Sequence, residues 1–139
     1  MLPHYRKIVL MFAVTALLPA LLFSCAEIAA RDNEANTQYE TAKRLLDNSG
    51  GYGKSLDEAQ SILETLVQQH PNYARAYIEL ARHAIMQGYR YSTPSGAVYQ
   101  NGALGAFEKF IKQALASDEN LADAYVFYGH LALEQDNPK

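Results

Sequence analysis

Apolar residues recur along most of the chain with the period of an α-helix. Between residues 55 and 69 they fall three or four positions apart, which places one apolar stripe along a helix. The same spacing returns in later stretches, and no stretch shows the strict alternation of a half-buried strand. The pattern therefore predicts an all-α fold. The expected helices cover residues 35–47, 55–69, 73–87, 103–117 and 121–135.

Polar residues at the expected helix starts suggest how two of these helices are capped. Asn33 and Asn36 are candidate N-caps for the first helix. Ser55 and Glu58 have the spacing of a capping box, which predicts that the second helix opens at Ser55. Pro71 should end that helix, because the residue before a proline is disfavoured in the helical region.

The apolar stripes predict which side chains face the core. In the second helix they are Leu56, Ala59, Ile62, Leu63, Leu66 and Val67; in the third, Tyr77, Leu80, Ala81, Ala84 and Ile85; in the fourth, Leu104, Phe107, Ile111, Ala114 and Leu115; in the fifth, Leu121, Ala124, Tyr125, Tyr128, Leu131 and Ala132. The fifth helix is apolar on nearly all sides, whereas the end of a helical stack should be polar. We therefore expect either that the chain is truncated or that another subunit covers this helix.

The first residues have the order of a secretory signal. Arg6 and Lys7 precede residues 8–23, which carry no charge, and Ser24 and Cys25 follow. The apolar run is short for a membrane span, which needs about 20 residues, and Pro19 interrupts it. We expect residues 1–24 to be a cleaved signal peptide.

Residues 22–25, Leu-Phe-Ser-Cys, resemble the lipobox of bacterial lipoproteins. The resemblance implies that Cys25 becomes the lipidated first residue, because the lipid is attached as a thioether and needs a thiol. Phe23 departs from the pattern, in which Ser or Ala is commoner. The alternative is an incidental cysteine in an uncleaved anchor.

The same resemblance implies a location. Ala26 stands where Asp often retains a lipoprotein in the inner membrane, so in a two-membrane cell we expect transfer to the outer membrane, facing the periplasm. Several acyl chains make a firm membrane anchor. Residues 25–34 would then be the lipidated cysteine and a short tether, and residues 35–139 a helical domain.

Two of the expected helices begin alike. Residues 73–81 read Tyr-Ala-Arg-Ala-Tyr-Ile-Glu-Leu-Ala, and residues 121–129 read Leu-Ala-Asp-Ala-Tyr-Val-Phe-Tyr-Gly. Both follow an amphipathic helix and a short turn, so they form an internal repeat. The repeat resembles the tetratricopeptide repeat, whose signature is matched by Ala59, Leu63, Leu66, Pro71, Tyr77, Leu80, Ala81, Tyr125, Tyr128 and Gly129, and more weakly by Tyr39, Ala42 and Leu46.

The resemblance implies an α-solenoid of about two and a half helix pairs over residues 35–139. The chain departs from the family pattern in four places. It has a few extra residues before Ser55 and an insertion at residues 88–102, Phe107 stands where Ala is usual, and Glu119 replaces the proline.

Such a solenoid implies protein binding on its concave face. The family's ligand-contacting places fall here on Thr37, Glu40, Arg44, Asp47, Arg75, Ile78, Arg82, Ile85, Asp123, Val126, His130 and Leu133. Of these we expect Arg44, Arg75, Ile78, Arg82, Ile85 and His130 to form the binding surface. A guanidinium group suits a peptide carboxylate, because it donates two parallel hydrogen bonds. The alternative is a solvated helix face with ion pairs such as Arg75–Glu79 and Glu40–Arg44.

The insertion allows two interpretations. It carries Tyr89, Tyr91 and Tyr99, and exposed tyrosines suit protein interfaces because they pair a large apolar ring with a hydroxyl. Equally, these rings could pack on the chain's own helices.

Charge and composition narrow the chemistry. The formal net charge is −3 and no basic block follows residue 7, so we expect no nucleic-acid binding. The single cysteine allows no intrachain disulfide and no Cys-rich zinc site. His130 and Glu134 share a helix face but supply only two metal ligands. Nothing resembles a nucleophile elbow or a phosphate loop, so we expect no enzyme activity and no cofactor.

The sequence thus favours a lipid-anchored adaptor that holds periplasmic proteins or peptides near the outer membrane. A second hypothesis is an accessory or regulatory subunit that docks an envelope enzyme. A third is a small metal or hydrolytic site near His130 and Glu134. The partner is a protein of unknown identity in the first two, and self-association through the last helix would explain its apolar surface.

Overall fold

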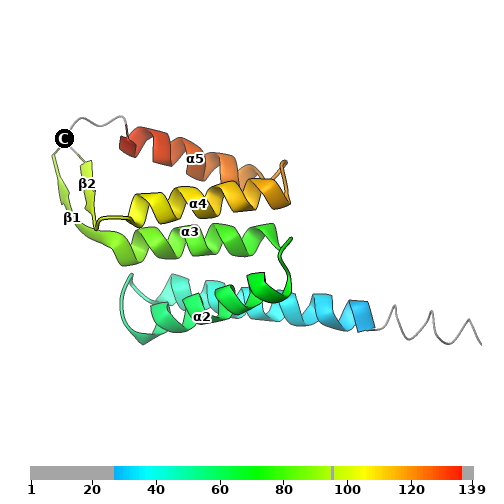
Figure 1. The fold of residues 1–139 in the computed structure, drawn as a ribbon. Coiled ribbons are helices and arrows are strands. Elements are labelled where there is room, and N and C mark those ends of the chain that lie inside the picture. The colour runs from blue at the N-terminus through cyan, green and yellow to red at the C-terminus, as the bar shows by residue number, and fades with distance from the viewer. Residues whose placement is uncertain (1–26, 95, 136–139) are drawn as a thin grey trace, which may run out of the picture. The chain divides into compact units, whose positions relative to one another are not determined.

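The computed structural model describes residues 27–94 and 96–135, so the predicted signal peptide and Cys25 lie outside the described residues. The chain divides into two compact units, Met1–Asn36 and Thr37–Lys139. In the first unit, residues 27–36 are helical, with an ion pair between Arg31 and Glu27 at 3.2 Å. The second unit contains the predicted helical domain, and its described part is mostly α-helix (Figure 1). The prediction of a mostly helical chain is confirmed.

The helix ends in the second unit agree closely with the hydrophobic pattern. Residues 37–48 are helical, and four further helices begin and end within one residue of the predicted positions. These are α2, Lys54–Gln69; α3, Ala74–Gly88; α4, Ala103–Ser117; and α5, Ala122–Gln135 (Figure 1).

The predicted N-caps are wrong. Asn33 and Asn36 both lie among the helical residues 27–48, so neither caps a helix start. Helix α2 begins at Lys54 instead of Ser55, and its N-cap is Gly53, with no capping side chain. The backbone N–H groups of residues 56 and 57 donate to the Gly53 carbonyl at 3.0 and 3.4 Å. Gly53 has a φ of +85°, which glycine adopts without strain, so the helix starts as soon as the glycine-rich turn ends.

Helix α3 is the centre of the domain. It lies between α2 and α4 (Figure 1), and buried residues occupy most of its circumference. It packs more extensively against α4 than against α2. At its last residue, Gly88, an added Cβ would lie 2.2 Å from the Cβ of Ala103, so only glycine lets the two helices approach this closely.

Two contacts fix the direction of the helix over residues 37–48 relative to α3. The rings of Tyr39 and Tyr73 lie 5.6 Å apart near the start of both helices. Near their ends, Arg82 and Asp47 form an ion pair at 2.6 Å. The two helices therefore run in the same direction, with partners 34 and 35 positions apart in the sequence.

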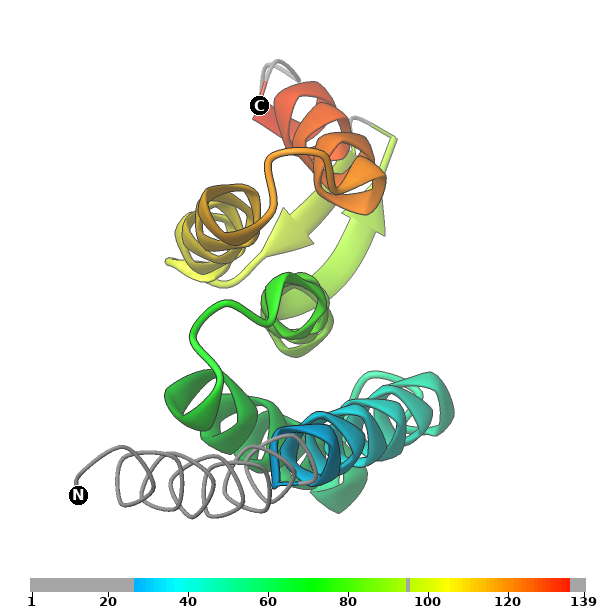
Figure 2. The same cartoon turned by 90° about the vertical axis from the view of Figure 1, so that its right-hand side faces the viewer.

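Helix α4 runs the opposite way. Its first residue, Ala103, adjoins the end of α3, and the hydroxyl of Ser117 at its end donates to the Pro71 carbonyl just before α3, at 3.4 Å. Figure 2 shows α3 and α4 side by side and nearly end-on. Helices α3 and α4 thus form an antiparallel pair.

The insertion contains a β-hairpin, which corrects the expectation of helix throughout the domain. Strand β1, Tyr89–Thr93, pairs antiparallel with β2, Gly96–Tyr99. Tyr, Thr and Val residues favour strands, and Pro94 and Gly96 suit a turn between them. The Thr93 hydroxyl donates to the Gly96 carbonyl at 2.9 Å, which helps to close this turn.

Two of the hairpin tyrosines pack on each other and the third is exposed, and their part in an interface stays a prediction. The rings of Tyr89 and Tyr99 pack edge to face at 6.2 Å, against each other and across the two strands. Tyr91 is exposed. Because the N–H of Gln100 donates to the Gly88 carbonyl at 2.7 Å, the hairpin closes back on its own base and leaves the α3–α4 pair intact.

Helix α5 packs on α4 through one narrow side. Ala124 and Leu131 are buried, and the ring of Phe127 lies 5.8 Å from that of Phe107. Tyr125, Tyr128 and Ala132, which we expected to face inward, are exposed. The sequence pattern could not distinguish the sides of this helix, because apolar residues surround it.

Candidate functional site

The predicted binding residues divide between two places in the structure. Arg44, Arg75 and Arg82 lie on the helix over residues 37–48 and on α3, which are joined by the Tyr39–Tyr73 and Asp47–Arg82 contacts. Ile85 and His130 line a different, narrow cavity of about 40 Å³ between α3 and α5. The six residues therefore do not form one continuous site.

Arg44 and Arg75 are available to a ligand. Both side chains are exposed, and neither forms an ion pair within the described part of the chain. The expected helical pairs Arg75–Glu79 and Glu40–Arg44 are thus not formed; Glu79 pairs with Arg82 instead, at 3.4 Å.

Arg82 is committed to its own chain. Its guanidinium group bridges Asp47 at 2.6 Å and Glu79 at 3.4 Å, and so ties the helix over residues 37–48 to α3. Burial opposes the charge of Arg82, but the hydrogen bond to Asp47 and the attraction of both carboxylates outweigh it and raise its pKa. A ligand would have to compete with Asp47 and Glu79, so we assign Arg82 a positioning role.

Ile78 must also be removed from the expected surface. Its side chain is only 5% exposed, so in this structure it belongs to the core. The family pattern places it beside Arg75 and Arg82, but α3 is covered on most sides and leaves little room for an exposed residue between them.

Glu79 is a buried carboxylate, whereas the helical spacing predicted only an exposed ion pair between Glu79 and Arg75. It is 6% exposed, and burial raises its pKa, although Arg82 and Lys43 favour the charged form. Its apolar neighbours in α3, Ile78 and Leu80, are the signal that this position lies inside.

Two tyrosines lie beside Arg75. Burial, with Glu79 as a further cause, raises the pKa of Tyr39 to about 12, and burial raises that of Tyr73 as well. Both phenols are therefore protonated at neutral pH and can donate hydrogen bonds. Arg75 is close enough to act on both pKa values, so it lies beside this ring pair.

A cleft of about 390 Å³ opens next to Arg75. It is formed by the start of α3, the end of α4 and the residue preceding α5. Arg75 and Tyr73 contribute from one side, and Asp118 and Leu121 from the other. This combination of one cation, one anion, a phenol and an apolar side chain suits an extended polar peptide rather than a small apolar ligand. We name Arg44, Tyr73, Arg75 and this cleft the arginine surface; Tyr39, which is only 6% exposed, supports Tyr73 from the core.

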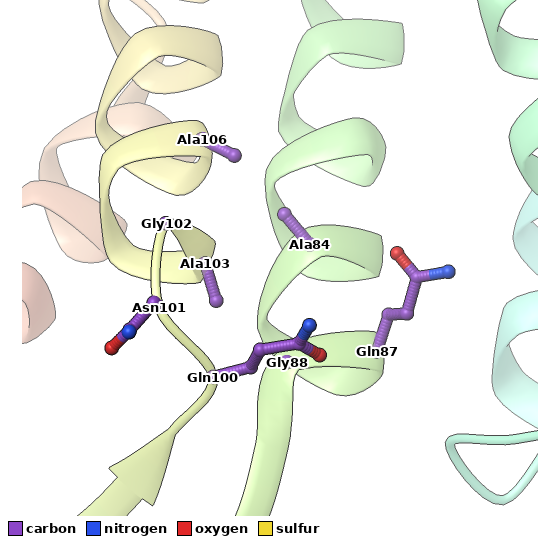
Figure 3. A pocket seen from close by; sticks show the side chains of 8 residues that line it. All are labelled: Ala84, Gln87, Gly88, Gln100, Asn101, Gly102, Ala103 and Ala106. Atoms are coloured by element: carbon purple, nitrogen blue, oxygen red, sulfur yellow. The ribbon is translucent and has the colours of Figure 1, made fainter.

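A second hollow, of about 210 Å³, lies where α3 ends and α4 begins (Figure 3). Small residues form much of its wall, and its larger side chains are the amides Gln87, Gln100 and Asn101. No titratable group lines it, so it offers no acid–base chemistry. The hollow exists because the small residues that let α3 and α4 approach do not fill the space between them.

Metal binding finds no support among the described side chains. Within that set, no three His, Cys, Asp or Glu residues gather as a metal site would require. The side chain of Glu134 is not among the described side chains, so the predicted pairing of Glu134 with His130 stays a prediction. None of the helices between residues 27 and 135 combines the length and the apolar character that crossing a bilayer requires.

His83 is a buried titratable group that should make stability depend on pH. It is 3% exposed, and its Nε2 makes no hydrogen bond to the described residues. Burial lowers its pKa below the ordinary value of 6.5, while Glu64 and Asp57 on α2 act in the opposite direction. The unfolded chain thus binds a proton at higher pH than the folded chain, so stability is full above 6.5 and is lost as pH falls below it.

We expect the free energy of unfolding, measured with urea, to fall between about pH 7.5 and about pH 5.5, and this part of the fall to be absent in His83→Phe. Glu79 has the opposite effect on stability. Because its pKa is raised in the folded chain, its stabilising contribution is lost as pH rises above 4.5. This effect is the same in the original chain and in His83→Phe, so it does not affect their comparison. Equal pH dependence in the two chains would show that His83 is not responsible.

Comparison with known proteins adds no assignment. No protein-family model, no curated protein and no solved structure matches the chain.

Proposed function

We propose that this chain is a protein-binding scaffold of helical repeats, which binds a partner at the arginine surface and is held at the bacterial outer membrane by a lipid on Cys25. The observation that carries the proposal is the parallel packing of the helix over residues 37–48 against α3. Their contacting residues are 34 and 35 positions apart, so one further helix, α2, separates two parallel helices along the chain, as stacked helix pairs require.

The rest of the second unit is consistent with a short α-solenoid. The α3–α4 pair is antiparallel, and α5 follows α4 with the sequence pattern that also begins α3. Because each helix pair exposes an apolar side that only a neighbour can cover, stacking of about two and a half pairs accounts for the order of the helices. The hairpin is an insertion between the two helices of one pair.

The exposed cations define the expected ligand. Arg44 and Arg75 can each pair with a carboxylate through two parallel hydrogen bonds, and the phenol of half-buried Tyr73 supplies a further donor. A segment of a protein that carries Asp, Glu or a free C-terminus fits this set. Binding, rather than catalysis, is the function we propose.

Crosslinking in living cells tests the arginine surface. A photo-crosslinking amino acid at position 44 should capture a discrete partner, and adding Arg75→Glu should lower the yield about tenfold, because reversing the charge repels a carboxylate. Lys54→Glu, an equal charge reversal at an exposed position of α2, should leave the yield unchanged.

The controls separate binding from anchoring. An equal yield from a crosslinker at exposed Glu58 of α2, or no loss with Arg75→Glu, would contradict the arginine surface. In the same cells, radioactive palmitate should label the chain but not Cys25→Ala. A persistent label in that variant would remove the lipid anchor from the proposal and leave the binding surface untouched.

A further inference from the structure

One side of α5 is apolar and open to solvent. Tyr125 is 57% exposed, Val126 70% and Leu133 76%. Small residues lie between them on the same side of the helix, at spacings of three and four. We call this set the α5 docking face; it consists of Ala122, Tyr125, Val126, Gly129, Ala132 and Leu133.

Helix α3 indicates what kind of element packs against such a face. It begins with the same Ala-x-Ala-Tyr pattern as α5, 48 positions earlier. The positions that match Tyr125, Val126 and Gly129 are Tyr77, Ile78 and Ala81, and on α3 all three are buried. The two helices therefore carry equivalent faces, one covered and one open.

The equivalence extends to the direction of packing. On α3, His83 is close to carboxylates of α2, the helix before it. The matching residue on α5 is Leu131, and it is buried on the side where Phe127 meets Phe107 of α4, again the helix before. Both helices thus use the same side to contact the preceding helix.

A different side of α3 receives the helix that follows. Ala84 and Ala106 line the hollow between α3 and α4, with Ala84 on the side of α3 that faces α4 (Figure 3). The residue of α5 that matches Ala84 is Ala132, which is exposed. The open side of α5 is therefore the side on which α3 receives an antiparallel helix with small residues at the contact.

Charge indicates the sequence of that helix. No Lys or Arg occurs between residues 113 and 135, and Asp118, Glu119 and Asp123 surround the start of α5. An antiparallel helix would bring its last turn to this acidic end. Lys or Arg in that turn would pair with the carboxylates and also interact favourably with the dipole of their own helix.

We propose that the α5 docking face binds an amphipathic helix of a partner protein, which runs antiparallel to α5, contacts it through small and aliphatic residues and carries Lys or Arg in its last turn. This interaction differs from the one proposed at the arginine surface, although Asp118 contributes to both. It uses helix-in-groove recognition, in which residues three and four positions apart anchor the ligand.

The test uses a synthetic peptide as the probe. The peptide copies residues 103–117, the sequence that covers α3, with Ala116→Lys and Ser117→Lys to supply the basic last turn. Fluorescence anisotropy with the full chain in mild detergent should show saturable binding with a Kd of about 10–100 μM, since a single short helix buries little surface.

Two matched variants make the result specific. Val126→Glu should weaken binding at least about tenfold, because it places an unpaired charge in the apolar contact. Tyr52→Glu, at a position 79% exposed in the glycine-rich turn, should leave the Kd unchanged. Replacing the two added lysines of the peptide by Glu should also weaken binding.

Three outcomes would overturn the proposal. These are no binding of the peptide up to about 1 mM, equal binding by Val126→Glu and Tyr52→Glu, and a concentration-dependent dimer of the full chain in sedimentation that Val126→Glu abolishes. The last result would assign the α5 docking face to a second copy of this chain.

Discussion

Gly88→Ala is expected to lower the free energy of unfolding by about 1–3 kcal/mol, the usual cost of forcing an extra methyl group into a packed contact. The new Cβ would lie 2.2 Å from the Cβ of Ala103, which is fixed to the backbone of α4 and cannot rotate away. The ends of α3 and α4 would have to separate. Urea unfolding followed by circular dichroism measures the loss, and a Tm lowered by several degrees should accompany it.

Gly105→Ala provides the matched control. Gly105 lies within α4, has no positive φ and would meet nothing within 4 Å of an added Cβ. Alanine is a better helix former than glycine, so this variant should gain about 0.5–1 kcal/mol. If both variants changed stability equally and in the same direction, the close approach of α3 and α4 at Gly88 would not explain the loss.

The helix ends were predictable where signals in the backbone set them. Pro71 and the glycine-rich turn before α2 act locally, through the backbone angles that each residue can adopt. Their effect does not depend on what packs nearby. Helix boundaries set in this way need no tertiary information, whereas the capping role of Ser55 depended on a side-chain contact that the Gly53 backbone replaces.

The hairpin was missed because its signals are short. Strand β1 has five residues and β2 four, and a segment of this length shows too few alternations to distinguish a strand from a loop. The Tyr-x-Tyr-Ser-Thr composition and the Pro-Ser-Gly turn were visible in the sequence. Because the surrounding segments are all helical, these residues indicated an insertion between helices and not a hairpin.

The candidate site was predicted only in part, because exposure depends on neighbours that periodicity does not specify. Arg44 and Arg75 are exposed as expected, while Arg82 is held by Asp47 from another helix and Ile78 is buried. The Arg82–Asp47 pair joins residues 35 positions apart. A search for ion pairs within one helix could not find it.

Phe107→Ala should cause the largest loss of stability, about 3–5 kcal/mol, the usual cost of removing a buried phenylalanine side chain. Phe107 is 3% exposed, contacts the ring of Phe127 at 5.8 Å and lines the cavity that also includes Leu131. It therefore holds α5 on α4. Hydrogen exchange should show faster exchange across residues 122–135 than in α3, because local opening of the last helix becomes easier.

Phe110→Ala separates this role from a general effect of truncating an aromatic residue of α4. Phe110 is only half-buried, with the ammonium group of Lys109 5.9 Å from its ring centroid, so the variant should lose about 1 kcal/mol and leave exchange in α5 nearly unchanged. Equal exchange in the two variants would show that Phe107 does not hold α5. If Phe107 does, its loss should also weaken the peptide probe at the α5 docking face, because that face is displayed only while α5 stays packed on α4. In the proposed repeat, Phe107 stands where Ala is usual, so this departure would be what secures the helix that carries the proposed α5 docking face.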